Sequence, residues 1–228
     1  MTKSMSPWLD PDVARYVLDH TAGPDEVLAD LVRETAESTG DRAGMQIATD
    51  QGVLLSLLVG LVGAERAVEV GTFTGYSSIC IARALRPNGR LLCCDVSEHW
   101  TDIARRAWER AGLTDRIELR LAPALDTLTA LPPDGMEVAG IENGPIDVAF
   151  IDADKGRYQA YYDELVPRMR AGGLICADNT LWSGAVTNET DDADTRALQQ
   201  FNEHVAADPR VESYILPVAD GLTLIRKR

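Results

Sequence analysis

The segment from Pro145 to Val186 constrains the fold more than any other part of this sequence, because it reads as a strand, a helix and a second strand. The apolar runs VAFI and LICA are each short and each end in polar residues, which is typical of strands buried on both faces. Residues 158–170 between them have a helical pattern. A helix that crosses between two buried strands predicts a parallel βαβ unit.

The polar residues that follow the two predicted strands form the first candidate site. Asp152 and Asp154 follow the first strand, and Asp178 and Asn179 follow the second. Adjacent parallel strands lie about 4.8 Å apart, so Asp152, Asp178 and Asn179 are expected to converge at the carboxyl edge of the sheet, where open α/β sheets bind ligands. Three oxygen side chains without Cys or His suit Mg²⁺ better than zinc. The alternative is that these residues only cap helices and loops.

A glycine turn after the first predicted strand forms the second candidate site. The run AVEVGTFTGYSSICIARAL places Glu69 at a strand end, Gly71 and Gly75 in the turn, and a helix from about residue 76. Glycines let the backbone approach a ligand, and a helix start offers free amides. The spacing differs from the GxGxxG fingerprint of nicotinamide-binding folds. Asp95 ends the next strand, where a carboxylate can hold a ribose diol. Glu69 could instead be satisfied by backbone amides.

The remaining pattern alternates helices and strands and ends in a hairpin. We predict helices over residues 11–20, 25–38, 49–61 (with Thr49 as N-cap), 101–111 and 195–207, strands over 90–94, 116–120, 210–217 and 222–226, and surface loops over 132–145 and 187–194. The predicted fold is α/β, with a doubly wound, mostly parallel seven-stranded sheet and a C-terminal antiparallel hairpin. Residues 1–40 are expected to form an N-terminal helical arm, and residues 41–228 one domain.

Charge and composition disfavour several classes of function. The formal net charge of −14 disfavours a nucleic-acid partner, since the surface repels phosphates at long range. The four cysteines lie in apolar runs without metal-ligand spacing, as in a reducing compartment. Residues 1–11 contain no apolar core of a signal peptide, and the longest apolar stretch is about half the length that a bilayer requires. We therefore expect a cytoplasmic protein without a membrane partner.

Taken together, the motifs MQIATDQG, EVGTFTGYS, FIDADKGRY, DNTLWSG and LPVADGLTLIRKR resemble the cation-dependent class I S-adenosylmethionine O-methyltransferases of the caffeoyl-CoA and catechol O-methyltransferase type. The resemblance runs from about residue 16 to the end. It implies a Rossmann-like class I methyltransferase fold, S-adenosylmethionine as methyl donor, Mg²⁺ or another divalent cation, and a homodimer. The donor-binding residues that it implies are Ile47, Glu69, Gly71, Ser77, Asp95, Ala124 and Asp154.

The same resemblance assigns the catalytic and acceptor residues. It implies that Asp152, Asp178 and Asn179 hold the cation and that Lys155 is the general base, although a surface lysine paired with an aspartate is the alternative. Trp182 and Ser183 are candidate acceptor contacts, and Trp182 could equally be a packing residue. Plant caffeoyl-CoA enzymes carry Asn at the position of Ser183, and this departure argues against a CoA ester as acceptor.

The expected function is methylation of one hydroxyl of a catechol-type small molecule, a vicinal dihydroxy aromatic, in bacterial specialised metabolism. The cation would stabilise a phenolate whose free phenol titrates near pH 10. Four alternatives stay open. They are a caffeoyl-CoA or other hydroxycinnamoyl ester O-methyltransferase, an RNA-directed methyltransferase, an NAD-dependent dehydrogenase, and a non-catalytic protein that retains the donor pocket. The sequence leaves the acceptor and the regiochemistry undetermined.

Overall fold

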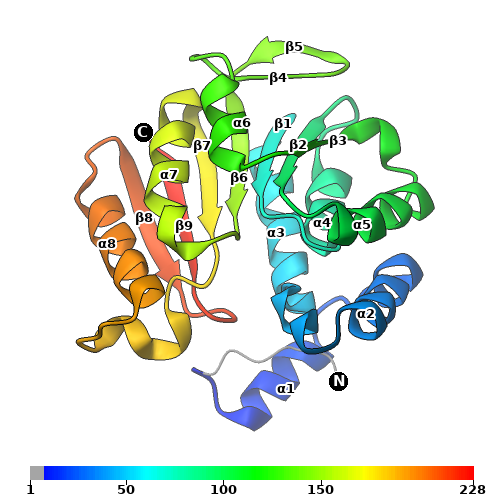
Figure 1. Ribbon diagram of the computed structural model, residues 1–228. Helices are drawn as coiled ribbons and strands as arrows, with labels where there is room; N and C mark the ends of the chain where they lie inside the picture. Colours follow the sequence, from blue (N-terminus) through cyan, green and yellow to red (C-terminus); the bar gives the residue numbers. More distant parts are fainter. Residues whose placement is uncertain (1–7) are drawn as a thin grey trace.

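The computed structural model describes residues 8–228, and its centre is a seven-stranded sheet (Figure 1). The strand order is β3-β2-β1-β6-β7-β9-β8; β9 runs antiparallel to both of its neighbours, and the other six strands run parallel to one another. The strands are β1 (Arg66–Val70), β2 (Arg90–Asp95), β3 (Ile117–Leu121), β6 (Ile146–Ile151), β7 (Met169–Ala177), β8 (Val211–Leu216) and β9 (Leu222–Lys227). The predicted fold class is confirmed, including the C-terminal hairpin.

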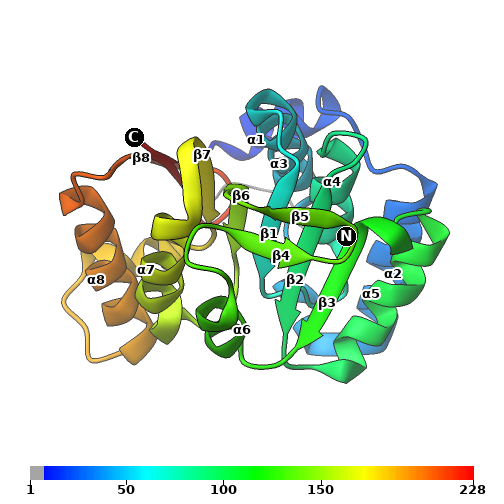
Figure 2. The ribbon, with the colours of Figure 1, turned by 90° about the horizontal axis from the view of Figure 1, so that it is seen from above.

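Helices cover both faces of the sheet (Figures 1 and 2). Apolar side chains of α2 (Glu26–Thr39), α3 (Thr49–Val62), α4 (Tyr76–Ala84) and α5 (Glu98–Arg110) form one hydrophobic core with the sheet. Those of α6 (Ala124–Ala130), α7 (Tyr158–Arg168) and α8 (Ala193–Ala207) form a second core on the other face. Every residue of β6 is buried, as expected of a strand between two helical layers. The chain order reverses between β1 and β6, the place where such sheets bind ligands.

Two predictions from the sequence are wrong in detail. The expected loop over residues 132–145 contains a short hairpin, β4 (Met136–Val138) and β5 (Ile141–Gly144), which Figure 2 shows lying across the sheet from above. It forms because Met136 and Val138 alternate with an exposed Glu137 and enter the second core. Thr49 is the first residue of α3 and not its N-cap. Ala48 holds that position, and its side chain has no oxygen to accept a capping hydrogen bond from the first turn.

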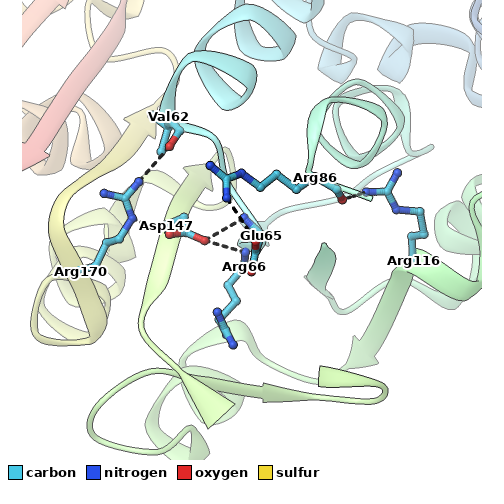
Figure 3. Close-up of polar contacts among 7 residues, drawn as sticks. All are labelled: Val62, Glu65, Arg66, Arg86, Arg116, Asp147 and Arg170. Carbon is cyan, nitrogen blue, oxygen red and sulfur yellow. Dashed lines mark hydrogen bonds and ion pairs between the residues drawn. The ribbon is translucent and has the colours of Figure 1, made fainter. Parts of the chain in front are cut away.

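The amino edge of the sheet is held by an aspartate among arginines (Figure 3). The Oδ2 of Asp147 accepts hydrogen bonds from the backbone N–H groups of Glu65 and Arg66, both at 2.8 Å, and its Oδ1 accepts one from Arg170. Arg170 also donates to the carbonyl of Val62, the last residue of α3. Cations suit this edge because the helices of a parallel βαβ sheet end there with free carbonyls. The aspartates of the candidate site lie at the opposite, carboxyl edge of the sheet.

The N-terminal helices lie at the carboxyl edge and beside α5. The first helix, α1 (Pro11–Asp19), is at the bottom of Figure 1, and the ring of Trp8 before it lies against Gly184 in the segment after β7. The next helix, α2, is tied to α5 because Glu34 forms ion pairs with Arg106 at 2.7 Å and Arg110 at 2.8 Å. The first seven residues of the predicted arm lie outside the described residues.

Within residues 8–228, no single helix is long and apolar enough to span a membrane. Glu26–Met45 and Thr49–Val62 would meet that requirement only as a pair, and they are bent by 76° relative to one another.

Candidate active site

A cavity of about 1220 Å³ opens at the carboxyl edge of the sheet. Its walls come from the segments that follow β1, β2, β6 and β7, from the 3₁₀ turn η1 (Gly40–Met45), and from the segment before α3. Twelve of the thirteen site residues predicted from the sequence line it, namely Ile47, Gly71, Ser77, Asp95, Ala124, Asp152, Asp154, Lys155, Asp178, Asn179, Trp182 and Ser183. The thirteenth, Glu69, is fully buried in β1 and does not line the cavity.

The structure brings the three predicted cation ligands to one place. Asp152 and Asp178 each follow paired residues of the neighbouring strands β6 and β7. The Nζ of Lys155 donates to the Oδ1 of Asp152 at 3.1 Å and to the Oδ1 of Asn179 at 2.6 Å, so these two side chains face a common point. Burial raises the pKa of Asp178 well above its ordinary value, and the nearby charge of Asp152 raises it further. The two carboxylates therefore repel one another across a small, poorly solvated space.

The chemistry of these side chains fits a hard cation. A divalent ion would remove the repulsion between the two carboxylates, and the amide oxygen of Asn179 would complete a set of three oxygen ligands. In the described part of the chain no cluster of three or more His, Cys, Asp or Glu side chains is arranged to hold a metal. The candidate set has only two such residues, and its third member is an amide.

Lys155 is a buried lysine at the floor of the cavity, with 8% of its surface exposed. Besides Asp152 and Asn179, its Nζ donates to the hydroxyl of Tyr158 at 2.7 Å. The same nitrogen lies 4.7 Å from the ring centre of Tyr158 and 5.8 Å from that of Trp182. Lys155 is therefore not a solvated surface lysine, although it does pair with an aspartate as the alternative interpretation required.

Backbone strain is concentrated around this cavity. Among residues 8–228, the non-glycine residues with left-handed φ angles are Phe73, Asn179, Trp182, Ser183 and Ala219. All five line the cavity. Such conformations cost about 1–3 kcal/mol each and persist where the surroundings hold them in place, which is common at functional sites. One of the contacts that hold them is the hydrogen bond from the N–H of Ser183 to the Oδ1 of Asp220.

Glu69 has one buried carboxylate oxygen without a hydrogen-bond partner. Its Oε2 accepts a hydrogen bond from the thiol of Cys93 at 3.3 Å, whereas its Oε1 is buried and has no partner within hydrogen-bond distance. Burial raises the pKa of Glu69 to about 8. The ammonium group of a methionine moiety would supply the missing partner and favour the ionised carboxylate. This orphaned oxygen fits S-adenosylmethionine.

The two glycines of the turn after β1 are required by the protein itself. A Cβ on Gly71, at φ 91°, would lie 2.1 Å from the carbonyl oxygen of Asp152. A Cβ on Gly75, at φ 90°, would lie 2.8 Å from the Cβ of Ala104 in α5. From the sequence, these glycines were expected to let the backbone approach a ligand. The structure shows a further reason for them, because they allow the turn to pack closely against α5 and the residue that follows β6.

Asp95 anchors the same turn. Its Oδ2 accepts the backbone N–H groups of Thr72 and Phe73, both at 2.9 Å, and its Oδ1 accepts that of Ser97 at 2.8 Å. Because Oδ2 is fully used, only the second lone pair of Oδ1 remains for the hydroxyls of a ribose. Asp95 thus has a structural role in addition to the predicted donor contact.

The other predicted residues are placed around the rim. The side chain of Asp154 is 59% exposed, accepts a hydrogen bond from the hydroxyl of Tyr161 at 2.5 Å, and pairs with Arg157 at 3.4 Å. Ser77 lies in the first turn of α4, and Ala124 is the first residue of α6. Among the cavity residues to which sequence reasoning assigned no role in the site are Gln51 and Asp220, although both lie in the quoted motifs MQIATDQG and LPVADGLTLIRKR.

Comparisons with known proteins identify relatives of this chain. Residues 18–228 match the sequence profile of a family described as O-methyltransferase. The chain is 38% identical to tricin synthase 2 of Oryza sativa subsp. japonica over 222 residues, which cover 93% of this chain and 73% of the relative. It is 36% identical to caffeoyl-CoA O-methyltransferase 2 of Petunia hybrida over 222 residues, which cover 93% of this chain and 89% of the relative.

Two solved structures are also similar to this chain. The O-methyltransferase TomG from Streptomyces achromogenes, solved in complex with SAM, superposes with a TM-score of 0.84 at 30% identity, covering 95% of this chain and 96% of its own. The O-methyltransferase from Bacillus cereus, solved in complex with SAH, superposes with a TM-score of 0.83 at 33% identity, covering 95% of this chain and 97% of its own.

Proposed function

The chain belongs to the O-methyltransferase family, and from that membership we propose that it methylates one hydroxyl of a catechol-type aromatic acceptor in a reaction that requires a divalent cation. That it is an S-adenosylmethionine-dependent O-methyltransferase of the caffeoyl-CoA type follows from its relatives and structural neighbours. Membership of this family argues against the NAD-dependent dehydrogenase considered from the sequence.

One observation carries the proposal. The oxygens of Asp152 and Asn179 converge on the nitrogen of Lys155, beside the buried carboxylate of Asp178, inside the cavity that the predicted donor residues also line. The three oxygen side chains would hold Mg²⁺, and Glu69, Asp95 and the turn after β1 would hold the donor. When bound, the cation supplies a Lewis acid that favours the phenolate, and the donor supplies the methyl group on a sulfonium.

Residues of the chain itself would accept the proton and align the two substrates. Lys155, in its neutral form, accepts the proton of the acceptor hydroxyl at Nζ, which already lies within hydrogen-bond distance of two of the ligand residues. The resulting phenolate oxygen takes the methyl group, and the sulfonium sulfur keeps the electron pair of the broken bond. Trp182 borders the cavity near Lys155 and offers a flat apolar wall to an aromatic ring. Alignment of donor and acceptor by these walls contributes to the rate.

The charges at the rim favour a small catechol over a CoA ester. Asp194 and Asp220 line the cavity. Apart from the buried Lys155, the basic residues that line it are Arg42 and Arg157, and Arg157 is already paired with Asp154. A CoA thioester would bring several phosphate charges to this rim and to a protein whose formal net charge is −14. The caffeoyl-CoA acceptor remains the second candidate, because relatives at 34–36% identity carry that name.

The setting of the reaction is also proposed. TomG from Streptomyces achromogenes is described as involved in tomaymycin synthesis, which supports an acceptor from bacterial specialised metabolism. A cytoplasmic location and a homodimeric state stay predictions from the sequence.

The test is a methyl-transfer screen with S-adenosylmethionine and four acceptors: caffeic acid, dopamine, a flavonoid with a catechol ring, and caffeoyl-CoA. Each acceptor is assayed with Mg²⁺ and with EDTA, and products are detected by mass spectrometry. We expect mono-methylated products from free catechols with Mg²⁺ and none with EDTA. Turnover that persists in EDTA would contradict the cation requirement, and turnover of caffeoyl-CoA alone would replace the free catechol by the ester.

A further inference from the structure

The backbone that follows β7 is fixed where it enters the site. We call residues 180–188 the wall segment, because part of it lines the cavity. Thr180 at its start is completely buried. The N–H and the hydroxyl of Thr180 donate to the carbonyl of Gly221 at 3.0 Å and 3.2 Å, and the same hydroxyl accepts a hydrogen bond from that of Thr223 at 2.8 Å. The β8–β9 hairpin therefore holds the wall segment from one side.

Two amide side chains of α8 hold the wall segment from the other side. The Nδ2 of Asn202 donates to the carbonyl of Thr180 at 2.8 Å. The Nε2 of Gln199 donates to the carbonyls of Val186 at 3.0 Å and Asn188 at 2.9 Å. Residues three positions apart lie on the same face of a helix. One face of α8 thus binds both ends of the wall segment.

Asn202 makes its bond to the wall segment although its other amide atom is left unpaired. Its Oδ1 is buried and has no hydrogen-bond partner within residues 8–228. A buried acceptor without a donor costs free energy, and a leucine of similar size would avoid that cost. Such exceptions are expected mainly at functional or strained sites.

The residues beside and between these anchored ends are the candidate acceptor contacts and a candidate cation ligand. Trp182 and Ser183 line the cavity with left-handed φ angles of 47° and 52°. Asn179, directly before the wall segment, has a φ angle of 58°. Thr180 therefore connects the residue that would hold the cation to the residues that would contact the acceptor. A displacement of its carbonyl would turn Trp182 and Ser183 relative to the cation.

The orientation of the acceptor decides which of its hydroxyls receives the methyl group. A catechol held through both oxygens presents two nearly equivalent hydroxyls, and the cation alone does not distinguish between them. A tenfold preference for one hydroxyl requires a difference of only about 1.4 kcal/mol between the two transition states. Contacts between the wall segment and a ring substituent are sufficient to supply a difference of that size.

We propose that Asn202 is a positioning residue that sets the regiochemistry of methylation, because it holds the carbonyl of Thr180 and thereby the orientation of Trp182 and Ser183. The inference rests on the proposed function, in which the acceptor is a catechol held by the cation. Asn202 does not line the cavity, so it acts through the wall segment. Gln199 supports the other end of that segment in the same way.

The experiment measures a product ratio, which does not depend on how much of the enzyme is folded. Wild type and Asn202→Leu are supplied with S-adenosylmethionine, Mg²⁺ and either dopamine or caffeic acid, and the two mono-methylated products are separated by chromatography. We expect wild type to favour one product and Asn202→Leu to move the ratio about 2- to 10-fold toward equal amounts, the range that corresponds to one hydrogen bond. Affinity for S-adenosylhomocysteine should be unchanged. A purely structural role of Asn202 would lower the yield of folded enzyme without changing the ratio.

A second measurement is independent of turnover. Amide hydrogen exchange of peptides that cover residues 180–188 is followed by mass spectrometry without ligands. Exchange in these peptides should be faster in Asn202→Leu than in wild type, because the wall segment opens more often once that bond is lost. Exchange in peptides from β1 should be the same in both proteins.

Two further variants serve as controls. Gln199→Met removes the bonds at the other end of the wall segment and should also move the product ratio, so it replaces Asn202→Leu if that variant does not fold. His204→Ala changes α8 two residues beyond Asn202, where the ring contacts Asp163 at 2.9 Å, and should leave the ratio unchanged.

The outcomes separate this inference from the proposed function. An unchanged ratio or unchanged exchange of the wall segment in Asn202→Leu overturns the role of Asn202, and an unchanged ratio in Gln199→Met does so where Asn202→Leu does not fold. Equal amounts of both products from wild type, or a shifted ratio in His204→Ala, overturn it as well. If wild type methylates neither catechol, the proposed function itself fails, and this inference with it.

Discussion

The Nζ of Lys155 lies 2.6 Å from the Oδ1 of Asn179. The residue predicted to accept the proton thus contacts a residue predicted to hold the cation. Because Lys155 is buried and also contacts Asp152, a change in either group must alter the electrostatic environment of the other. Proton transfer and cation binding in this site are therefore coupled, and the two roles must be tested separately.

Replacement of Lys155 by Met should reduce kcat about 10²- to 10⁴-fold, the range that a general base contributes. The same change removes a positive charge beside Asp152 and Asn179, so Mn²⁺ affinity should not fall and is expected to rise. Steady-state kinetics and a Mn²⁺ titration of the same variant check both statements. Weaker Mn²⁺ binding in Lys155→Met would mean that the lysine supports the site structurally.

Replacement of Asp152 by Ala should abolish Mn²⁺ binding and methyl transfer while the protein stays folded. The matched control is Asp154→Ala, two residues further along the chain. The side chain of Asp154 is largely exposed and bonded to Tyr161 and Arg157, so this variant should retain Mn²⁺ binding. Circular dichroism, Mn²⁺ titration and turnover are compared for both. Normal turnover in Asp152→Ala would refute the assigned cation site.

Glu69 should make the stability of the protein depend on pH. Its pKa is raised from 4.5 to about 8 in the folded state, so the folded protein binds the proton more tightly than the unfolded chain. Its stabilising contribution is complete below pH 4.5 and is lost as the pH rises to 8, by at most about 1.4 kcal/mol per pH unit. Glu69→Gln should lack this dependence and gain stability relative to wild type between pH 6 and pH 9.

Denaturant unfolding at pH 6 and pH 9 measures that difference. The same variant should bind S-adenosylhomocysteine more weakly, because an amide cannot neutralise the ammonium of the methionine moiety. If the difference in free energy of unfolding between Glu69→Gln and wild type were the same at pH 6 and pH 9, Glu69 would be ionised in the free protein at both pH values.

Replacement of Asp220 by Ala should weaken acceptor binding and leave donor and cation binding unchanged. Asp220 holds the N–H of Ser183, and its own carbonyl accepts the N–H of Leu181 at 3.0 Å. Without that side chain, Trp182 and Ser183 lose one contact that holds their left-handed conformations. We expect a rise of about tenfold in the KM of the acceptor, equivalent to one hydrogen bond of about 1.4 kcal/mol. Kinetics with varied acceptor and fixed donor check this.

Replacement of Asp147 by Ala should destabilise the protein by about 2–4 kcal/mol without changing the affinity for donor or cation. The change leaves the N–H groups of Glu65 and Arg66 and the guanidinium of Arg170 without their acceptor. Asp147 lies at the edge of the sheet opposite the cavity. Its replacement should therefore change the stability of the protein without changing the ligand-binding site. Chemical denaturation and S-adenosylhomocysteine calorimetry measure the two quantities, and a change in affinity alone would contradict the expected outcome.

The βαβ unit and the meeting of Asp152 with Asp178 could be predicted because parallel strands have one spacing and one polarity. Short-range patterns were less informative elsewhere. The hairpin of β4 and β5 was missed because Pro and Gly in residues 132–145 resemble a loop, while its strands depend on burial of Met136 and Val138 in a core built by distant helices. Thr49 resembled an N-cap, yet the N-cap of α3 lies one residue earlier, at Ala48, which lines the cavity.

The sequence by itself determined the order of the elements, the seven-stranded sheet and the polar residues at its carboxyl edge, because buried strands and turn glycines leave local signals. Only the tertiary structure decided which atoms meet there: the contact of Lys155 with Asn179, and the burial of Glu69 with one carboxylate oxygen unpaired. Lys155 and Asn179 are 24 positions apart in the chain, as are Glu69 and its hydrogen-bond partner Cys93. Their geometry depends on packing between elements, which no local pattern of amino acids encodes.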